Sequence, residues 1–223
     1  MDYRERYRRW MESPVIDKAT KDELAAIAHD EKELENRFFK DLEFGTGGLR
    51  GIIGAGSNRM NKYTVGRATQ GLANYIIKHG REAMDRGVVI AYDTRRMSKE
   101  FALETALVLN ANGIKVYLYN EMQPTPVLSF SVRELGAIAG IVITASHNPP
   151  AYNGYKVYWE DGGQIPPQRS EEIIKEVYAV KGFEEVKTIS REQAENQGLL
   201  NMIGQEVADR FIERVKSLSI NKQ

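Results

Sequence analysis

The sequence predicts an α/β protein with a mixed, mainly parallel sheet flanked by helices and preceded by a helical amino-terminal extension. Two apolar runs rich in β-branched residues, Val88–Tyr92 and Gly140–Ile143, indicate buried strands, and the alternation over Ile114–Tyr119 indicates a third strand. Helical patterns with short connectors separate these runs, which favours right-handed crossovers between parallel strands. The alternating segment Tyr155–Trp159 is expected to return from a loop as a hairpin strand, which makes the sheet mixed.

The extension is predicted to occupy residues 1–43. Four apolar residues recur there at helical spacing: Tyr3, Tyr7, Trp10 and Met11. Thr20–Glu23 has the pattern of a capping box that opens a short helix through Ala28, and Asp30 is the expected cap of another helix through Leu42. The aromatic stripe is interpreted as packing surface.

Later helices have clear start and stop signals. Thr64 is the predicted cap of a helix that ends at Gly80, and Ser98 is the predicted cap of a helix over 99–112. Thr125 is expected to cap a helix from Pro126 to about Gly136, and Pro166-Pro167 to begin a helix that ends at about Val180. Residues 182–200 are polar and match no pattern, whereas 204–218 form a helix with one apolar face. The predicted division is therefore the extension, an α/β domain over 44–200, and a carboxy-terminal helical segment over 201–223.

Composition limits the classes of function. The 223 residues include 42% hydrophobic and 28% charged residues, typical of a soluble globular protein with a core. Lysine plus arginine equals aspartate plus glutamate, 31 each, so no basic excess indicates nucleic acid or a membrane surface. There is no cysteine, which excludes disulfides and thiolate metal sites, and a cytoplasmic location is expected.

A glycine-rich segment, Phe44–Gly56, contains six glycines and Arg50. One interpretation is an anion nest, in which successive backbone N–H groups and the Arg50 guanidinium face a phosphate. The other is a flexible connector with a surface arginine. The segment lacks Gly-Lys-Ser/Thr and no strand–helix pair brackets it, so it is neither a P-loop nor a dinucleotide fingerprint.

A second loop contains the side chains that most strongly indicate a functional site. The strand that starts at Gly140 should end near Ile143, which places Ser146 just beyond its carboxyl end, where ligands bind in open α/β sheets. Asn153-Gly154 is a turn signal, and Lys156 lies on the returning strand. Ser146 and His147 are adjacent and no third group is placed beside them, which disfavours a hydrolase triad.

Asp93 and Arg95 lie at the carboxyl end of another predicted strand. They are expected to pair with each other or to brace the loop at Ser146, and direct contact with substrate is less favoured.

Together, Thr144-Ala145-Ser146-His147-Asn148-Pro149 and Asn153-Gly154-Tyr155-Lys156 resemble the phosphoserine signature of the α-D-phosphohexomutases, the phosphoglucomutase and phosphomannomutase superfamily. Phe44-Gly45-Thr46 through Leu49-Arg50-Gly51 resembles the amino-terminal motif of the same enzymes. The extension and the string Asn148-Pro149-Pro150-Ala151-Tyr152-Asn153-Gly154-Tyr155-Lys156 are most similar to the phosphoglucomutase/phosphopentomutase branch.

The resemblance implies a sugar-phosphate mutase that moves a phosphoryl group through a phosphoserine and a bisphosphate intermediate. It also implies Mg²⁺, bound in part through the phosphate on Ser146, and glucose 1,6-bisphosphate as activator. The implied site residues are Ser146 as phosphoryl carrier, Lys156 or His147 for proton transfer, Arg50, Thr46, Gly47 and Asn148 for phosphate or substrate binding, and Asp93 and Arg95 in support.

Only the first domain of that family is represented. Neither the Asp-x-Asp-x-Asp magnesium loop nor the Gly-Glu-x-Ser sugar motif occurs, so the chain is expected to be a fragment that folds but is inactive without the remaining mutase domains. The alternative is a stand-alone, non-catalytic phosphate- or phosphosugar-binding module. A flavodoxin-like nucleotide-binding protein is disfavoured, because neither loop follows a strand and opens a helix as that fold requires.

Overall fold

A six-stranded mixed sheet forms the centre of the molecule, in a computed structural model that describes residues 2–220. Its strand order is β1-β5-β4-β2-β3-β6, with β2 parallel to β3 and β4, β3 parallel to β6, and β5 antiparallel to β1 and β4. The strands are β1 (Gly48–Ile52), β2 (Val88–Tyr92), β3 (Val116–Tyr119), β4 (Ala139–Ile143), β5 (Tyr152–Trp159) and β6 (Leu200–Ile203). The predicted fold class is therefore confirmed.

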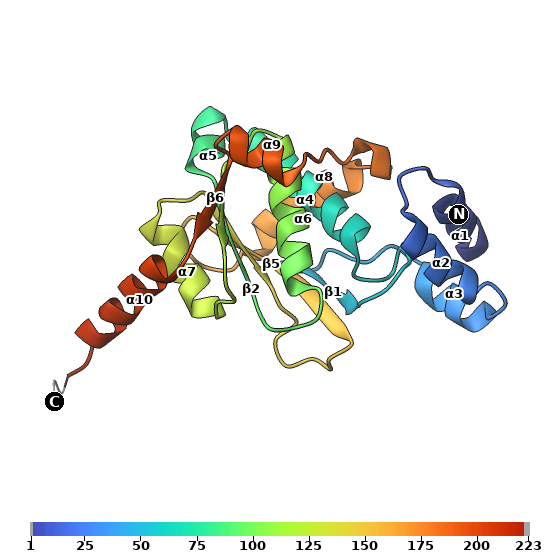
Figure 1. Ribbon diagram of the computed structural model, residues 1–223, viewed down its shortest axis with the longest axis horizontal. Helices are drawn as coiled ribbons and strands as arrows, with labels where there is room; N and C mark the ends of the chain where they lie inside the picture. Colours follow the sequence, from blue (N-terminus) through green and yellow to red (C-terminus); the bar gives the residue numbers. More distant parts are fainter. Residues whose placement is uncertain (1, 221–223) are drawn as a thin grey trace.

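Helices cover both faces of this sheet (Figure 1). One face packs against α4 (Lys62–Ile77), α6 (Ser98–Ala111) and α8 (Pro167–Ala179), and the other against α7 (Thr125–Glu134). The alternation of β2 explains the two layers, since Val88 and Ile90 face the first set of helices while Val89 and Ala91 face α7. The short helices α5 (Arg81–Arg86) and α9 (Arg191–Asn196) lie at the opposite end of the strands from the loop that carries Ser146.

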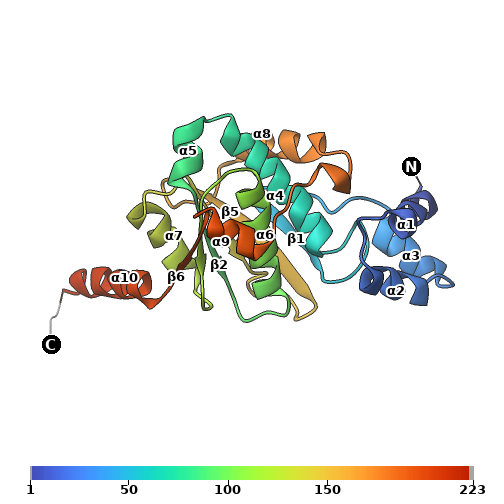
Figure 2. The same cartoon turned by 45° about the horizontal axis from the view of Figure 1, so that its top comes forward.

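The extension forms a helical cluster at one end of the molecule (Figure 2), made of α1 (Tyr3–Glu12), α2 (Lys18–Ala26) and α3 (Glu31–Phe38). Trp10, Leu24 and Phe38 are at most 3% exposed and form its own core. Asp30 caps α3 as predicted. The prediction of a capping box at Thr20–Glu23 is wrong, because Asp17 caps α2 by accepting the N–H of Thr20.

Other helix starts also differ from the sequence prediction. Asn61 caps α4, with Thr64 as the reciprocal partner three residues later. Met97, in a left-handed conformation with φ 64°, precedes α6, and Ser98 is its first helical residue rather than its cap. Thr125 likewise opens α7, after Pro124. Thr64 accepts the Asn61 N–H from inside the first turn, which gives the same sequence pattern as a cap.

Two segments without a strand prediction join the sheet. β1 lies inside the glycine-rich segment, and β6 follows a one-turn 3₁₀ helix, η1 (Phe183–Glu185), and α9 in the unassigned stretch. β6 spans the boundary expected at residue 200, which keeps 201–203 within the sheet. The predicted ends at Met1 and Gln223 lie outside the described residues, and the three-part division stays a prediction.

The carboxy-terminal helix, α10 (Gln205–Ser217), confirms the prediction over 204–218. It points away from the sheet at the end opposite the extension (Figure 1). Val207 and Ala208 are buried against α7, but Ile212, Val215 and Leu218 farther along are 44%, 48% and 66% exposed. Within residues 2–220, no helix combines the length and apolar character needed to cross a bilayer.

Candidate phosphoryl-transfer site

The serine loop joins β4 to β5 at the carboxyl end of β4. Ser146 is exposed and has φ 55°, the left-handed region that non-glycine residues rarely adopt. Its N–H donates to Thr144 Oγ1 at 2.9 Å, and the N–H of Asn148 donates to the Ala145 carbonyl at 3.1 Å. A strained conformation held by specific contacts is typical of functional loops, and here it presents the hydroxyl to solvent.

Ser146 and Lys156 line one cavity of about 420 Å³ together with residues from the glycine-rich segment. Lys156 pairs with Val142 on β4 and with Gly48 on β1. Arg50 lies two residues beyond Gly48, and so on the same face of the sheet as Lys156. Strand pairing therefore brings the serine loop and the glycine-rich segment together, although about 100 residues separate them in the sequence.

Only some of the predicted binding residues line this cavity. Thr46, Gly47 and Arg50 line it, whereas His147 and Asn148 do not. His147 Nδ1 lies 3.4 Å from Ser146 Oγ, longer than an ordinary hydrogen bond. Asn148 Oδ1 accepts from Arg50 Nη1 at 3.3 Å, which links the serine loop to β1.

Sequence reasoning missed four polar residues of the cavity, Lys40, Glu43, Asn58 and Gln164. The first belongs to the predicted extension, and the last follows the turn after β5, so no linear motif connects them with Ser146. The charged lining residues are Lys40, Arg50, Lys156 and Glu43, which leaves an excess of positive charge. Such a lining favours an anion.

Arg95 fixes the backbone of the serine loop. Its Nη2 donates to the carbonyls of Ser146 and Asn148 at 2.8 and 2.6 Å, and its Nη1 to those of Pro149 and Tyr152 at 3.0 and 3.1 Å. One guanidinium thus contacts four carbonyls, a use of its planar donor set that lysine cannot reproduce.

Asp93 in turn orients Arg95. Its Oδ1 accepts the Arg95 backbone N–H at 2.9 Å and the Ser98 hydroxyl at 2.7 Å, and its Oδ2 lies 3.5 Å from Arg95 Nε. Asp93 and Arg95 do not line the cavity. Their contacts are with the loop, with Ser98 and with each other, and not with the cavity at Ser146.

The turn predicted at Asn153-Gly154 is wrong, since both residues lie within β5. The Asn153 amide is buried and donates to the Arg96 carbonyl at 2.9 Å and to Ser98 Oγ at 3.0 Å. A Cβ at Gly154 would lie 2.5 Å from the Thr144 carbonyl oxygen. These residue types therefore allow the close approach of β5 to the serine loop, and not a turn.

The backbone anion nest predicted for the glycine-rich segment is largely absent. Gly45 and Gly48 exchange both N–H···O=C bonds, at 2.8 and 3.2 Å, and the N–H of Gly47 donates to the buried Ser170 hydroxyl at 3.3 Å. Ser170 Oγ donates back to the Gly45 carbonyl at 3.2 Å. Within the described residues the N–H of Thr46 has no partner, so it and the Arg50 side chain remain as donors toward the cavity.

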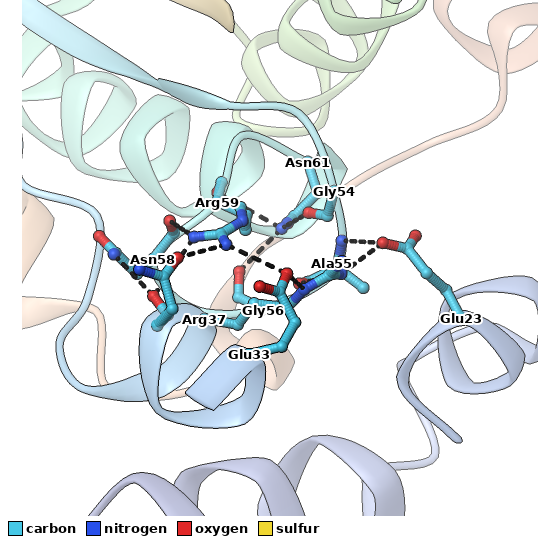
Figure 3. Close-up of polar contacts among 10 residues, drawn as sticks. Glu23, Glu33, Arg37, Gly54, Ala55, Gly56, Asn58, Arg59 and Asn61 are labelled. Carbon is cyan, nitrogen blue, oxygen red and sulfur yellow. Dashed lines mark hydrogen bonds and ion pairs between the residues drawn. The ribbon is translucent and has the colours of Figure 1, made fainter. Parts of the chain in front are cut away.

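Beyond β1, an ionic network around two largely buried arginines joins the segment after this strand to the extension (Figure 3). Arg59, with a side chain 6% exposed, contacts Glu33 at 3.4 Å and the Asn36 side-chain oxygen at 2.6 Å. Arg37 donates to the Ala55 carbonyl at 3.1 Å and pairs with Glu23 and Glu33. The segment that leaves β1 is therefore held by α2 and α3, which fixes the strand that carries Arg50.

Among the described residues there is no group of three or more His, Cys, Asp or Glu side chains placed to hold a metal ion. The side chains around Ser146 do not by themselves form a magnesium site. A phosphate on Ser146 would add oxygen ligands of the type that Mg²⁺ prefers.

Fold and site together define a class: an α/β/α domain that presents a serine hydroxyl, a lysine and an arginine to a cavity with an excess of positive charge. The model of a protein family described as phosphoglucomutase/phosphomannomutase, alpha/beta/alpha domain I, matches residues 41–182. The chain belongs to this family.

Several proteins with mutase names are similar to this chain in sequence or in structure. Phosphopentomutase from Mus musculus is 41% identical over 163 residues, which are 70% of this chain and 26% of that protein. Phosphoglucomutase from Staphylococcus saprophyticus is 39% identical over 188 residues, which are 84% of this chain and 34% of that protein. A phosphoglucomutase/phosphomannomutase family protein from Burkholderia thailandensis superposes with a TM-score of 0.60 at 25% identity, over 81% of this chain and 36% of that one. The chain thus spans about a quarter to a third of the length of these curated relatives.

Proposed function

We propose that this domain carries the phosphoserine of a sugar-phosphate mutase that transfers a phosphoryl group between C1 and C6 of glucose phosphate, or C1 and C5 of a pentose phosphate. One observation carries the proposal: Ser146, strained and exposed, lines the same cavity as Arg50, Thr46 and Lys156. The family supplies the reaction class, and the similarity to phosphoglucomutases and a phosphopentomutase supports the two substrate alternatives.

In the proposed step the bond between phosphorus and Ser146 Oγ breaks while a sugar hydroxyl oxygen bonds to phosphorus. The sugar hydroxyl loses its proton to Lys156, or to His147 as the alternative, and the same residue then returns that proton to Ser146 Oγ as the serine is released. Arg50 and the Thr46 N–H would neutralise and orient the transferring phosphate. The bisphosphate would then return its other phosphate to Ser146, which regenerates the phosphoserine.

Mg²⁺ is proposed as the cofactor, and it supplies charge neutralisation of the phosphoryl group when bound. Ser146, through its phosphate, is the ligand offered by this domain, and the other ligands are proposed to come from the remaining mutase domains. Glucose 1,6-bisphosphate is proposed as the activator that primes Ser146. The cytoplasmic location stays a prediction.

The phosphorylated residue can be located by incubating the complete mutase with glucose 1,6-bisphosphate, followed by intact mass and peptide mapping. We expect one phosphate, on Ser146, and none on Ser146→Ala. A phosphate on another residue that persists in Ser146→Ala would exclude this assignment.

Lys156 is proposed as the main proton-transfer residue because it lines the cavity while His147 does not. In the complete mutase, Lys156→Met should lower kcat much more than it raises KM. His147→Gln is the matched comparison. A larger kcat loss in His147→Gln would reverse the assignment.

Turnover by the 223-residue chain alone is not expected, because positioning of the sugar and metal clamping would come from the other domains. Positioning alone contributes about 7 kcal/mol or more to such reactions. A coupled assay with glucose 1-phosphate, glucose 1,6-bisphosphate and Mg²⁺ tests this. Turnover that Ser146→Ala abolishes would refute it, whereas phosphate binding without phosphorylation in any form would favour the non-catalytic binding module.

A further inference from the structure

A second cavity lies where the helical extension meets the α/β domain. It measures about 210 Å³ and lies between α1, α4 and the chain that follows α8. Leu42 and Leu49 line both this cavity and the one at Ser146, so these two side chains form the wall between them. Neither Ser146 nor any other proposed catalytic residue reaches the second cavity.

Its lining is strongly basic. Four cations, Arg6, Arg9, Arg67 and Lys181, face a single carboxylate, Asp41. Asp41 already pairs with Arg6, and it accepts from Arg67 Nη1 at 2.7 Å. Arg9 and Lys181 contact only carbonyls here: Arg9 Nη2 donates to Lys181 O at 3.3 Å, and Lys181 Nζ to Tyr178 O at 2.9 Å.

One donor in this cluster is unused. Arg6 Nε is buried and has no hydrogen-bond partner among the described residues. Buried N–H groups almost always have a partner, so this donor adds uncompensated positive charge behind the cavity wall. The groups that an acceptor in the cavity can reach are the exposed Arg9 and Lys181 side chains. A carboxylate or phosphate oxygen fits best, because arginine side chains bind such groups through paired N–H donors.

The remaining walls are aromatic. Trp10, Tyr63, Tyr178 and Phe183 line the cavity, and the Trp10 and Phe183 rings pack edge to face with centroids 5.1 Å apart. The volume corresponds to about seven water molecules at ~30 Å³ each, enough for a small ring. A ligand with an apolar or aromatic body and one anionic end would match both the aromatic walls and the excess of cations.

We propose that this second cavity binds a phosphate monoester with an apolar or aromatic body, at a site separate from Ser146. The site joins two parts of the chain, since Arg6 and Trp10 come from the extension while Arg67 and Lys181 come from the α/β domain. Its occupant would contact Leu42 and Leu49, and so would act on the segment that carries Lys40 and Arg50 into the serine cavity. The binding does not depend on mutase activity.

The test uses phenyl phosphate as probe and isothermal titration on the 223-residue chain. We expect saturable binding that weakens at least tenfold in the double variant Arg9→Gln/Lys181→Gln, whose side chains are exposed and have no structural ion pair in the described part of the chain. Arg8→Gln is the matched control, since Arg8 is also exposed on α1 but does not line this cavity, and it should change affinity less than twofold.

Binding at the serine cavity is the main alternative, and Arg50→Gln distinguishes it. Retained affinity in Arg50→Gln supports the proposal, whereas affinity lost there and kept in Arg9→Gln/Lys181→Gln overturns it. Absence of saturable binding also overturns it. As a second measurement, nuclear magnetic resonance of the unmodified chain should show the Trp10 indole and Phe183 amide shifting on titration, and shifts confined to Thr46, Ser146 and Gln164 would contradict the proposal.

Discussion

Replacement of Arg95 by methionine should release the serine loop from its support. The side chain is only 15% exposed, and its guanidinium donates to the carbonyls of Ser146, Asn148, Pro149 and Tyr152. Methionine keeps a similar length without any donor. The variant therefore removes all four contacts at little cost in side-chain volume.

The size of the effect follows from those contacts. A hydrogen bond from a charged donor contributes about 1.5–3 kcal/mol where the acceptor would otherwise be buried. Ser146 and Pro149 are exposed, so water can replace the arginine at their carbonyls, and Pro149 O also accepts the Tyr152 N–H at 3.0 Å. We therefore expect the free energy of opening the loop to fall by about 2–4 kcal/mol, less than four full contacts.

Hydrogen exchange of the Asn148 and Tyr152 amides measures that free energy, because both N–H groups bond within the loop. A loss of about 2–4 kcal/mol corresponds to exchange roughly 30- to 1,000-fold faster. Arg96→Met is the matched control, since the exposed Arg96 side chain makes no hydrogen bond or ion pair within residues 2–220. Exchange that changes less than threefold in Arg95→Met, or equally in both variants, would refute the reasoning.

Three further predictions concern stability. Gly154→Ala places a Cβ 2.5 Å from the Thr144 carbonyl oxygen and should lower the free energy of unfolding by about 1–3 kcal/mol in urea denaturation; an unchanged midpoint would contradict this. Arg59→Met should cost about 2–4 kcal/mol and accelerate exchange in α3, because the side chain is 6% exposed and bonded to that helix, and an effect confined to other helices would count against it. Burial raises the pKa of Glu104 against the opposing charge of Lys62. The folded state therefore disfavours ionised Glu104, so Glu104→Gln should be more stable than the unmodified chain at pH 7. That advantage should shrink as pH falls through the raised pKa of folded Glu104 and be absent below the unfolded value of about 4.3, and an advantage that grows in acid would be inconsistent.

The sequence alone determined four of the six strands, β2 to β5, and the position of the loop that carries Ser146. Apolar β-branched runs such as β2 and β4 can be recognised locally, because burial on both faces demands an uninterrupted apolar stretch. The end of β4 at Ile143 then placed Ser146 in a loop. The family followed from the same residues, since the motifs around Ser146 and Arg50 are contiguous strings whose order along the chain is itself informative.

Tertiary structure decided what the glycines and polar residues do. β1 could not be predicted because its glycines respond to β5: a Cβ at Gly48 would lie 1.8 Å from the Tyr155 carbonyl oxygen. The bridge between Gly45 and Gly48 uses two N–H groups that one interpretation of the sequence directed at an anion, and Ser170, more than 120 residues away, accepts a third from Gly47.

The second cavity has no sequence signature at all. Its cations come from α1, α4 and the chain after α8, and none of them belongs to a recognisable sequence motif. Only the packing of the extension against the α/β domain brings them together. Local patterns encode which residues are buried and where helices and strands begin. The charge and shape of a cavity arise from contacts between segments far apart in the chain, which periodicity and motif spacing do not contain.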